Sequence, residues 1–144
     1  MPNRLISSII AQQTPVIADK STTVFTAATL MTQHKVSAVM VVDAGQLIGI
    51  FTERDCLSRV ITQHKDPQTT TVEEVMTASL ITIASSRPLG HALHMMNDYG
   101  FRHMPIVDNG VPVGIISARD ALGIDMMAFE RELRQREEIT ELLG

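Results

Sequence analysis

A hydroxyl residue, an arginine and an aspartate recur with the same spacing at two places in the chain, each time directly after an apolar run. The two segments read Thr52-Glu53-Arg54-Asp55 and Ser117-Ala118-Arg119-Asp120. At the start of a helix, free backbone N–H groups together with a hydroxyl and a guanidinium suit a phosphate. A carboxylate beside them can accept hydrogen bonds from both hydroxyls of a ribose. The two segments therefore predict a pair of nucleotide sites.

The same pattern also has a purely structural interpretation. A hydroxyl residue followed three positions later by an acid is a capping box, in which the hydroxyl accepts from the third helical amide and the acid lies at the positive helix end. One such segment alone favours the cap. The recurrence at matched positions, with Arg directly before Asp in both copies, favours ligand binding.

The segments belong to a longer repeat, because the second half of the chain matches the first half 65 residues later without a gap. Among the first-copy residues that recur unchanged are Ala27, Met31, Asp43, Gly45, Gly49, Ile50, Arg54, Asp55 and Leu57. A unit of this length cannot bury its apolar face alone. We therefore expect the two copies, spanning Val16 to Leu122, to pack together about a pseudo-twofold axis.

Each copy reads as strand, helix, strand, strand and helix, which predicts an α+β (α/β-like) fold of two β-α-β-β-α repeats. Helical spacing predicts helices over 24–34 and 89–99, preceded by extended pieces at 14–18 and 80–83. Hairpins over 39–51 and 104–116 turn at Asp43-Ala44-Gly45 and Asp108-Asn109-Gly110. A last helix should follow Thr52 and Ser117.

The expected organisation has three parts: residues 1–66 as an N-terminal arm with the first repeat, 67–125 as a linker with the second repeat, and 126–144 as a C-terminal helix. The apolar spacing over 5–11 suits a short amphipathic helix or arm on the core. The C-terminal helix would cover its own core or contact another subunit.

The composition argues against several classes of function. A net charge of −4 and 3% aromatic residues without Trp argue against a nucleic-acid partner. No apolar run approaches the roughly 20 residues of a membrane span. The single cysteine excludes an internal disulfide and fits a reducing compartment, so we expect a cytoplasmic protein.

These features resemble a tandem pair of cystathionine-β-synthase (CBS) domains, called a Bateman module. The resemblance covers nearly all of Val16 to Leu122. It is carried by the doubled Asp-x-Gly turns, the Gly-hydrophobic-x-Thr/Ser-x-x-Asp segments and the stretch from Phe101 to Asp108. It implies a regulatory sensor that binds AMP, ADP, ATP, S-adenosylmethionine or NAD in two clefts. The sensor would change conformation, signal to an unidentified partner protein and pair as a homodimer.

The resemblance also assigns site residues. Asp55 and Asp120 would bind the ribose hydroxyls, while Thr52 and Ser117, with Arg54 and Arg119, would face phosphate. The adenine would lie against Val16, Ser37 and Ala38 in the cleft holding Asp120, and against Ile81, Arg102, His103 and Met104 in the cleft holding Asp55. Arg102 and His103 align with the uncharged Ser37 and Ala38. The Asp55 cleft should therefore prefer the more highly phosphorylated ligand.

Rival interpretations are a structural or oligomerisation module without ligand and, less favoured, a small nucleotide hydrolase. We expect no catalytic residues and no required cofactor. His91 and His94 have a spacing that can bind metal, but no Cys or carboxylate nearby completes a ligand set, so no metal site is expected. Cys56 begins a predicted helix, where its thiol pKa could fall, although its counterpart Ala121 favours a packed residue.

Overall fold

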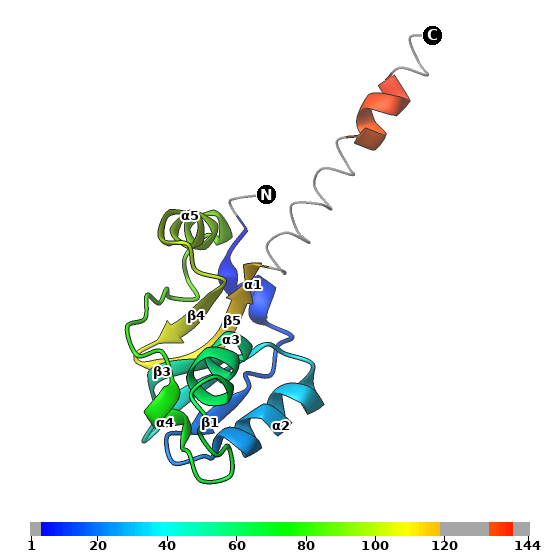
Figure 1. The fold of residues 1–144 in the computed structure, drawn as a ribbon. Coiled ribbons are helices and arrows are strands. Elements are labelled where there is room, and N and C mark those ends of the chain that lie inside the picture. Colours follow the sequence, from blue (N-terminus) through cyan, green and yellow to red (C-terminus); the bar gives the residue numbers. More distant parts are fainter. Residues whose placement is uncertain (1–3, 119–132, 140–144) are drawn as a thin grey trace.

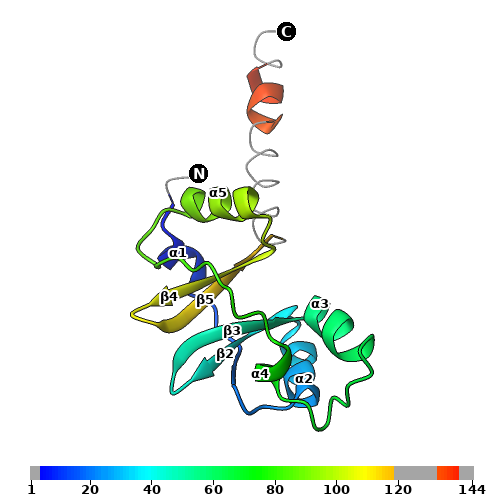
Figure 2. The same cartoon turned by 60° about the vertical axis from the view of Figure 1, so that its left-hand side comes forward.

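The computed structural model describes residues 4–118 and 133–139. From the arm to the end of the first repeat, the elements are α1 (Ile6–Ile10), β1 (Ile17–Asp19), α2 (Val24–His34), β2 (Ala38–Asp43), β3 (Gln46–Thr52), α3 (Glu53–Asp55) and the π-helix η1 (Cys56–Ile61). They are followed by α4 (Val72–Val75) and by α5 (Leu89–Tyr99), β4 (His103–Asp108) and β5 (Val111–Ser117) of the second repeat. Figure 1 and Figure 2 show two small sheets stacked one above the other, each with its own helices.

The two hairpins have the same register. β2 pairs with β3 so that Met40 faces Ile50, and β4 pairs with β5 so that Pro105 faces Ile115. Both turns place two successive residues at positive φ, Ala44-Gly45 and Asn109-Gly110. Two such residues are what a tight two-residue hairpin turn requires. The Asp-x-Gly prediction is confirmed in both copies.

The repeats differ at their first strand. β1 pairs parallel with β2, whereas the expected extended piece at 80–83 forms only one isolated bridge, between Ile83 and Ile106. In the first copy the Met40 N–H donates to the Val16 carbonyl over 3.0 Å. The counterpart of Met40 is Pro105, which has no N–H to donate. The pairing between the first extended segment and the hairpin is therefore shorter in the second copy.

The long helices bury matching stripes. α2 buries Val24, Ala27 and Met31, and α5 buries their counterparts Leu89, Ala92 and Met96. This spacing of three and four residues faces one side of a helix. Each helix covers its own hairpin, so the described residues contain two apolar clusters, one per repeat.

The short helix that leads into each repeat packs on the opposite repeat. Ile6 and Ile10 of α1 lie in the second cluster, while Val72 and Val75 of α4 lie in the first. This exchange ties the two repeats together and confirms the prediction of an arm lying on the core.

Two glycines allow the lead-in segments to approach the sheets. A Cβ at Gly49 would meet Met76, and a Cβ at its counterpart Gly114 would lie 2.9 Å from the Cβ of Ile10. The Gln13 side chain adds a further link, because its amide donates to the Ile115 carbonyl over 3.0 Å and accepts from the Ile115 N–H over 3.1 Å. The Gln13 amide thus pairs with β5 as a neighbouring strand would.

The predicted helices at the ends of the repeats are only partly described. After Thr52 the chain is helical, as expected, with α3 continuing into η1. After Ser117 the predicted helix lies outside the described residues beyond Ala118, as do Met126, Met127 and Phe129 of the predicted C-terminal helix. Residues 133–139 are helical and exposed, and they lie away from the two sheets in both views (Figures 1 and 2). None of the described helices has the length and apolarity needed to cross a membrane.

Candidate functional site: a cleft between the repeats

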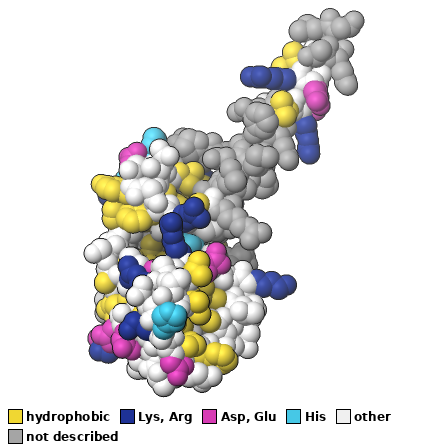
Figure 3. Space-filling view, in the orientation of Figure 1, with side chains coloured by type: hydrophobic (Ala, Val, Ile, Leu, Met, Phe, Trp, Pro, Cys, Tyr) yellow, Lys and Arg dark blue, Asp and Glu magenta, His cyan; other side chains and the backbone are white. Residues whose placement is uncertain are grey.

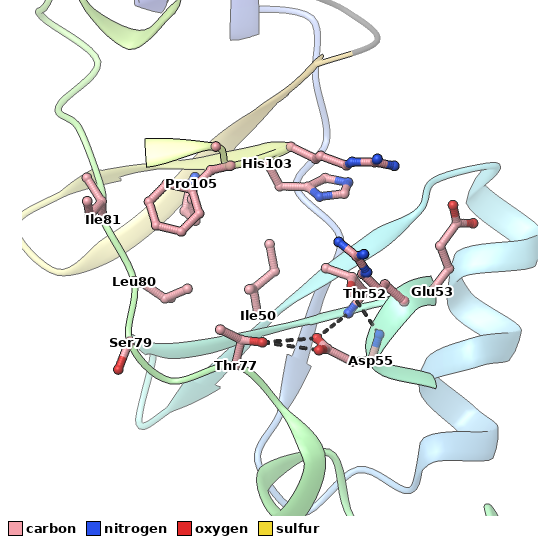
Figure 4. Close-up of a pocket in the computed structure, with 14 residues that line it drawn as sticks. Ile50, Thr52, Glu53, Asp55, Thr77, Ser79, Leu80, Ile81, His103 and Pro105 are labelled. Carbon is pink, nitrogen blue, oxygen red and sulfur yellow. Dashed lines mark hydrogen bonds between the residues drawn. The ribbon is translucent and has the colours of Figure 1, made fainter. Parts of the chain in front are cut away.

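A cavity of about 260 Å³ lies between the two repeats, next to Asp55. Its lining comes from the end of β3, the start of α3, the segment after α4 and the start of β4. The lining residues are Ile50, Thr52, Glu53, Arg54, Asp55, Thr77, Ser79, Leu80, Ile81, Gly100, Phe101, Arg102, His103 and Pro105. In Figure 4 Leu80, Ile81 and Pro105 lie toward one end and Thr52 and Asp55 toward the other. The cleft thus has an apolar end and a polar end.

The polar end is built around Asp55, which is only 7% exposed. The Asp55 N–H donates to Thr52 Oγ1 over 3.1 Å, and the Thr52 N–H donates to Asp55 Oδ2 over 3.1 Å. These two bonds form the capping box that the sequence predicts. The Glu53 N–H donates to the Ser37 carbonyl over 3.0 Å, which attaches the start of α3 to the residue before β2.

A hydroxyl group already contacts the Asp55 carboxylate. Thr77 Oγ1 lies 3.1 Å from Asp55 Oδ1 and 3.3 Å from Oδ2 and donates to them (Figure 4). The Arg59 guanidinium flanks the same carboxylate, with 3.8 Å between Nε and Oδ1. Arg59 also donates to the Met76 carbonyl over 2.7 Å. An ionised carboxylate offers about four acceptor positions, so Asp55 can cap the helix and still accept further hydroxyls.

Thr77 is a site residue that the sequence analysis missed. It reaches the cleft because the Ile50 and Thr77 backbones exchange two hydrogen bonds, of 2.9 and 2.8 Å. Its only sequence signal is its place two residues after the apolar Val75, in the segment leading into the second repeat. Nothing local links that segment to β3, so the contact with Asp55 had no signal of its own.

The cleft also gathers basic side chains from both repeats. Arg54 comes from α3, Arg102 directly precedes β4, and His103 begins that strand. His103 Nε2 lies 2.8 Å from Ser37 Oγ, which joins the second repeat to the first by a hydrogen bond between side chains. Elsewhere on the face seen in Figure 3, acidic and basic side chains are interspersed.

Most residues predicted for the Asp55 cleft lie in its wall. Thr52, Arg54, Asp55, Ile81, Arg102 and His103 all line the cavity. The side chain of Met104, in contrast, is completely buried in the second apolar cluster. Successive residues of a strand point to opposite faces, so His103 and Pro105 face the cleft while Met104 faces the core. Contact between Met104 and a ligand would have to come from its backbone.

The second predicted cleft is described only in part. Ala38 is buried, Val16 packs against the first cluster, and Ser37 bonds His103. Ser117 ends β5, whereas Arg119 and Asp120 lie outside the described residues.

The remaining lining residues had weak sequence signals or none. Ile50, Glu53, Ser79, Leu80, Gly100, Phe101 and Pro105 were not predicted as site residues. His103 and Pro105 alternate along β4, so period two could have found Pro105 once His103 was placed, whereas Phe101 lies before the strand. Within the described part of the chain, no group of three or more His, Cys, Asp or Glu residues is arranged to hold a metal ion.

Cys56 does not have the lowered pKa that its helical position suggested. The side chain is half-buried against the first cluster, and burial raises the pKa of the Cys56 thiol. We expect iodoacetamide at pH 8 to alkylate Cys56 more slowly in the folded protein than in urea, because the thiolate is the reactive form. Mass spectrometry over time measures both rates. Equal rates would contradict this prediction.

The fold and the cleft together define a class: a doubled α+β unit with a cleft between its copies. The chain belongs to the CBS domain family, whose pattern matches residues 6–62 and 72–126. The resemblance seen in the sequence is thereby confirmed.

Three relatives illustrate the family. The CBS domain-containing protein YhcV of Bacillus subtilis is 39% identical over 75% of this chain and 76% of its own length. The mitochondrial CBS domain-containing protein CBSX3 of Arabidopsis thaliana is 34% identical over 78% of this chain and 57% of its own. A crystallised CBS domain pair of protein MJ0100, in complex with 5′-methylthioadenosine and S-adenosyl-L-methionine, has a TM-score of 0.78 and 28% identity. That match covers 88% of this chain and 99% of the other. The chain spans less than two thirds of the length of the first curated relatives.

Proposed function

We propose that this protein is a regulatory sensor that binds an adenosine-containing ligand in the Asp55 cleft. The ligand class comprises AMP, ADP, ATP, S-adenosylmethionine and NAD. The observation that carries the proposal is the Thr77 hydroxyl, which lies 3.1 and 3.3 Å from the two Asp55 oxygens inside the cleft. A ribose diol would make the same contacts with this carboxylate. The bound adenosine derivatives of the MJ0100 domain pair support this ligand class.

The basic side chains of the cleft favour a phosphorylated ligand. Arg54, Arg102 and His103 line one cavity in a chain whose net charge is −4. Guanidinium groups bind phosphate oxygens through paired hydrogen bonds. We therefore propose that Thr52 and Arg54 face the phosphate, that Arg102 and His103 lie beside the base, and that ATP binds this cleft more tightly than AMP.

Signalling would follow from the position of the ligand between the repeats. The cleft takes side chains from both copies, and Ser37 and His103 already join the copies there. A ligand shifts a conformational equilibrium only through different affinities for the two arrangements. In our proposal the occupied and empty arrangements are distinguished by an unidentified partner protein. The protein acts as a homodimer, and no catalytic step is involved.

The repeat makes a second cleft part of the proposal. Val16, Ser37, Ala38 and Ser117 would line it, together with Arg119 and Asp120, as the repeat and the resemblance imply. In our proposal this cleft would carry fewer basic side chains than the first, because Ser37 and Ala38 are the counterparts of Arg102 and His103.

A ligand panel read by thermal unfolding tests the proposal. Adenosine, AMP, ADP, ATP, S-adenosylmethionine and NAD are each added to the purified protein. A ligand at 100 times its Kd adds about 2.7 kcal/mol to the free energy of unfolding. For a chain of this size that gain raises Tm by roughly 5–10 °C. With all six ligands at the same concentration, we expect the rise in Tm with ATP to exceed the rise with AMP, and the rise with AMP to exceed the rise with adenosine.

The capping box at Thr52 and Asp55 supports the rival structural module, which predicts no Tm shift with any of these ligands. Steady hydrolysis of ATP by the pure protein would instead favour the nucleotide hydrolase. A shift of Tm without turnover supports the sensor against both rivals.

A further inference from the structure

Two aromatic rings are stacked beside the cleft without being buried in either core. Tyr99 ends α5 and Phe101 precedes β4, with Gly100 between them. Their ring centroids are 6.1 Å apart, at an angle of 25° between the ring planes. Phe101 and Gly100 line the cleft, whereas Tyr99 is 62% exposed. The pair therefore connects the cleft wall to the molecular surface.

The same backbone occurs in the first repeat without aromatic rings. His34, Lys35 and Val36 are the counterparts of Tyr99, Gly100 and Phe101. Lys35 and Gly100 both have left-handed backbone conformations, with φ of 54° and 71°. The N–H groups of Val36 and Phe101 donate to the carbonyls of Met31 and Met96 over 3.0 and 3.1 Å. The fold therefore does not require the rings, which occur only in the second copy, where the segment between α5 and β4 lines the Asp55 cleft.

We propose that Phe101 is the stacking surface for the base of the ligand and that Tyr99 is a positioning residue that holds the Phe101 ring. This inference rests on the proposed adenosine ligand and adds a specificity determinant to it. A purine presents a flat π-face that stacks on an aromatic side chain. The stack with Tyr99 restricts the Phe101 ring, which lowers the entropy lost when the base binds. The cleft thereby selects ligands that carry an aromatic base.

The first repeat supplies the matched variants. Phe101→Val and Tyr99→His each introduce the residue that the same backbone already accepts at Val36 and His34, and both should fold. Phe101→Trp keeps an aromatic surface. Isothermal titration calorimetry measures the affinity of each variant for AMP, ATP and S-adenosylmethionine.

We expect Phe101→Val to weaken binding by about tenfold or more, as loss of base stacking does, and Phe101→Trp to retain most of the affinity. Tyr99→His should weaken binding by about threefold, since only the support of the ring is lost. Tyr99 is the only tyrosine in a chain without Trp, so its fluorescence should change when a ligand contacts Phe101.

Two results would overturn the inference. One is wild-type affinity in Phe101→Val. The other is a loss in Phe101→Trp equal to that in Phe101→Val, which would mean that side-chain shape and not the aromatic surface matters. If the wild-type protein binds none of the three ligands, the proposed function fails and this inference fails with it. Tight wild-type binding together with an unaffected Phe101→Val removes the stacking role alone.

Discussion

Replacing Asp55 by Asn is expected to weaken the binding of adenosine ligands by about 10- to 100-fold, because hydrogen bonds to a charged group each contribute about 1.5–3 kcal/mol. The carboxylate can accept from both hydroxyls of a ribose, whereas the amide of Asn offers one oxygen. The measurement is the Kd for ATP and S-adenosylmethionine by calorimetry. The effect is expected to be largest for whichever ligand binds the wild-type protein most tightly.

Asn is the informative replacement because it preserves the local structure. Its Oδ1 can still accept the Thr52 N–H, which Asp55 Oδ2 accepts over 3.1 Å. The start of α3 should therefore remain capped, since Thr52 is its N-terminal capping residue and a side-chain amide at the third helical position can complete a capping box, as Gln does. Urea unfolding of the variant checks that its stability is close to that of the wild-type protein.

Asp66→Asn is the matched control. Asp66 is exposed between η1 and α4 and accepts the Gln68 N–H over 2.9 Å, a bond that Asn can also make. It removes the same charge from the chain without touching the cleft. Binding by Asp55→Asn that is as tight as binding by Asp66→Asn would sink the ribose assignment and leave Asp55 as a helix cap.

Replacing Ile6 by Ala is expected to lower the free energy of unfolding by about 2–5 kcal/mol, the usual cost of truncating a buried Ile. Ile6 belongs to α1, a helix of only five residues at the start of the chain. Its side chain is nevertheless completely buried in the second apolar cluster. The Ile6 N–H also donates to the Arg87 carbonyl over 2.9 Å, and the Leu89 N–H to the Arg4 carbonyl over 2.7 Å. The arm therefore contributes a buried side chain to the core of a repeat that begins some 70 residues later.

Leu5→Ala is the control for this prediction, because Leu5 is the adjacent residue and is 47% exposed. Leu5→Ala should lower the free energy of unfolding by less than about 1 kcal/mol, as substitutions of exposed residues usually do. Urea unfolding followed by circular dichroism measures the whole chain, and the fluorescence of Tyr99 reports on the second repeat. Equal costs for Leu5→Ala and Ile6→Ala would mean that the arm does not stabilise that repeat.

The local features of the chain were predictable because each depends on neighbours in sequence. The bounds of α2 and α5 follow from apolar residues at helical spacing, and the hairpin turns follow from Asp-x-Gly. The capping box at Thr52 and Asp55 is likewise a contact between residues three positions apart. The repeat then carried each of these predictions from one copy to the other.

The long-range contacts had no such signal. α1 and α4 each pack on the repeat to which they do not lead by chain order. The spacing of apolar residues predicts a helix but does not predict which core that helix covers. The shortened first strand of the second repeat depends on Pro105 standing where Met40 donates a hydrogen bond. That loss becomes visible only when the pairing partner is known.

The sequence by itself therefore determined the repeats, their helices and hairpins, and six of the fourteen residues that line the Asp55 cleft. Only the tertiary structure decided that Thr77 contacts Asp55, that Ser37 bonds His103 and that Met104 turns into the core. The physical reason is that hydrogen-bonding patterns and apolar periodicity act over a few residues. A cleft, in contrast, is formed by the packing of segments that meet only in the folded chain.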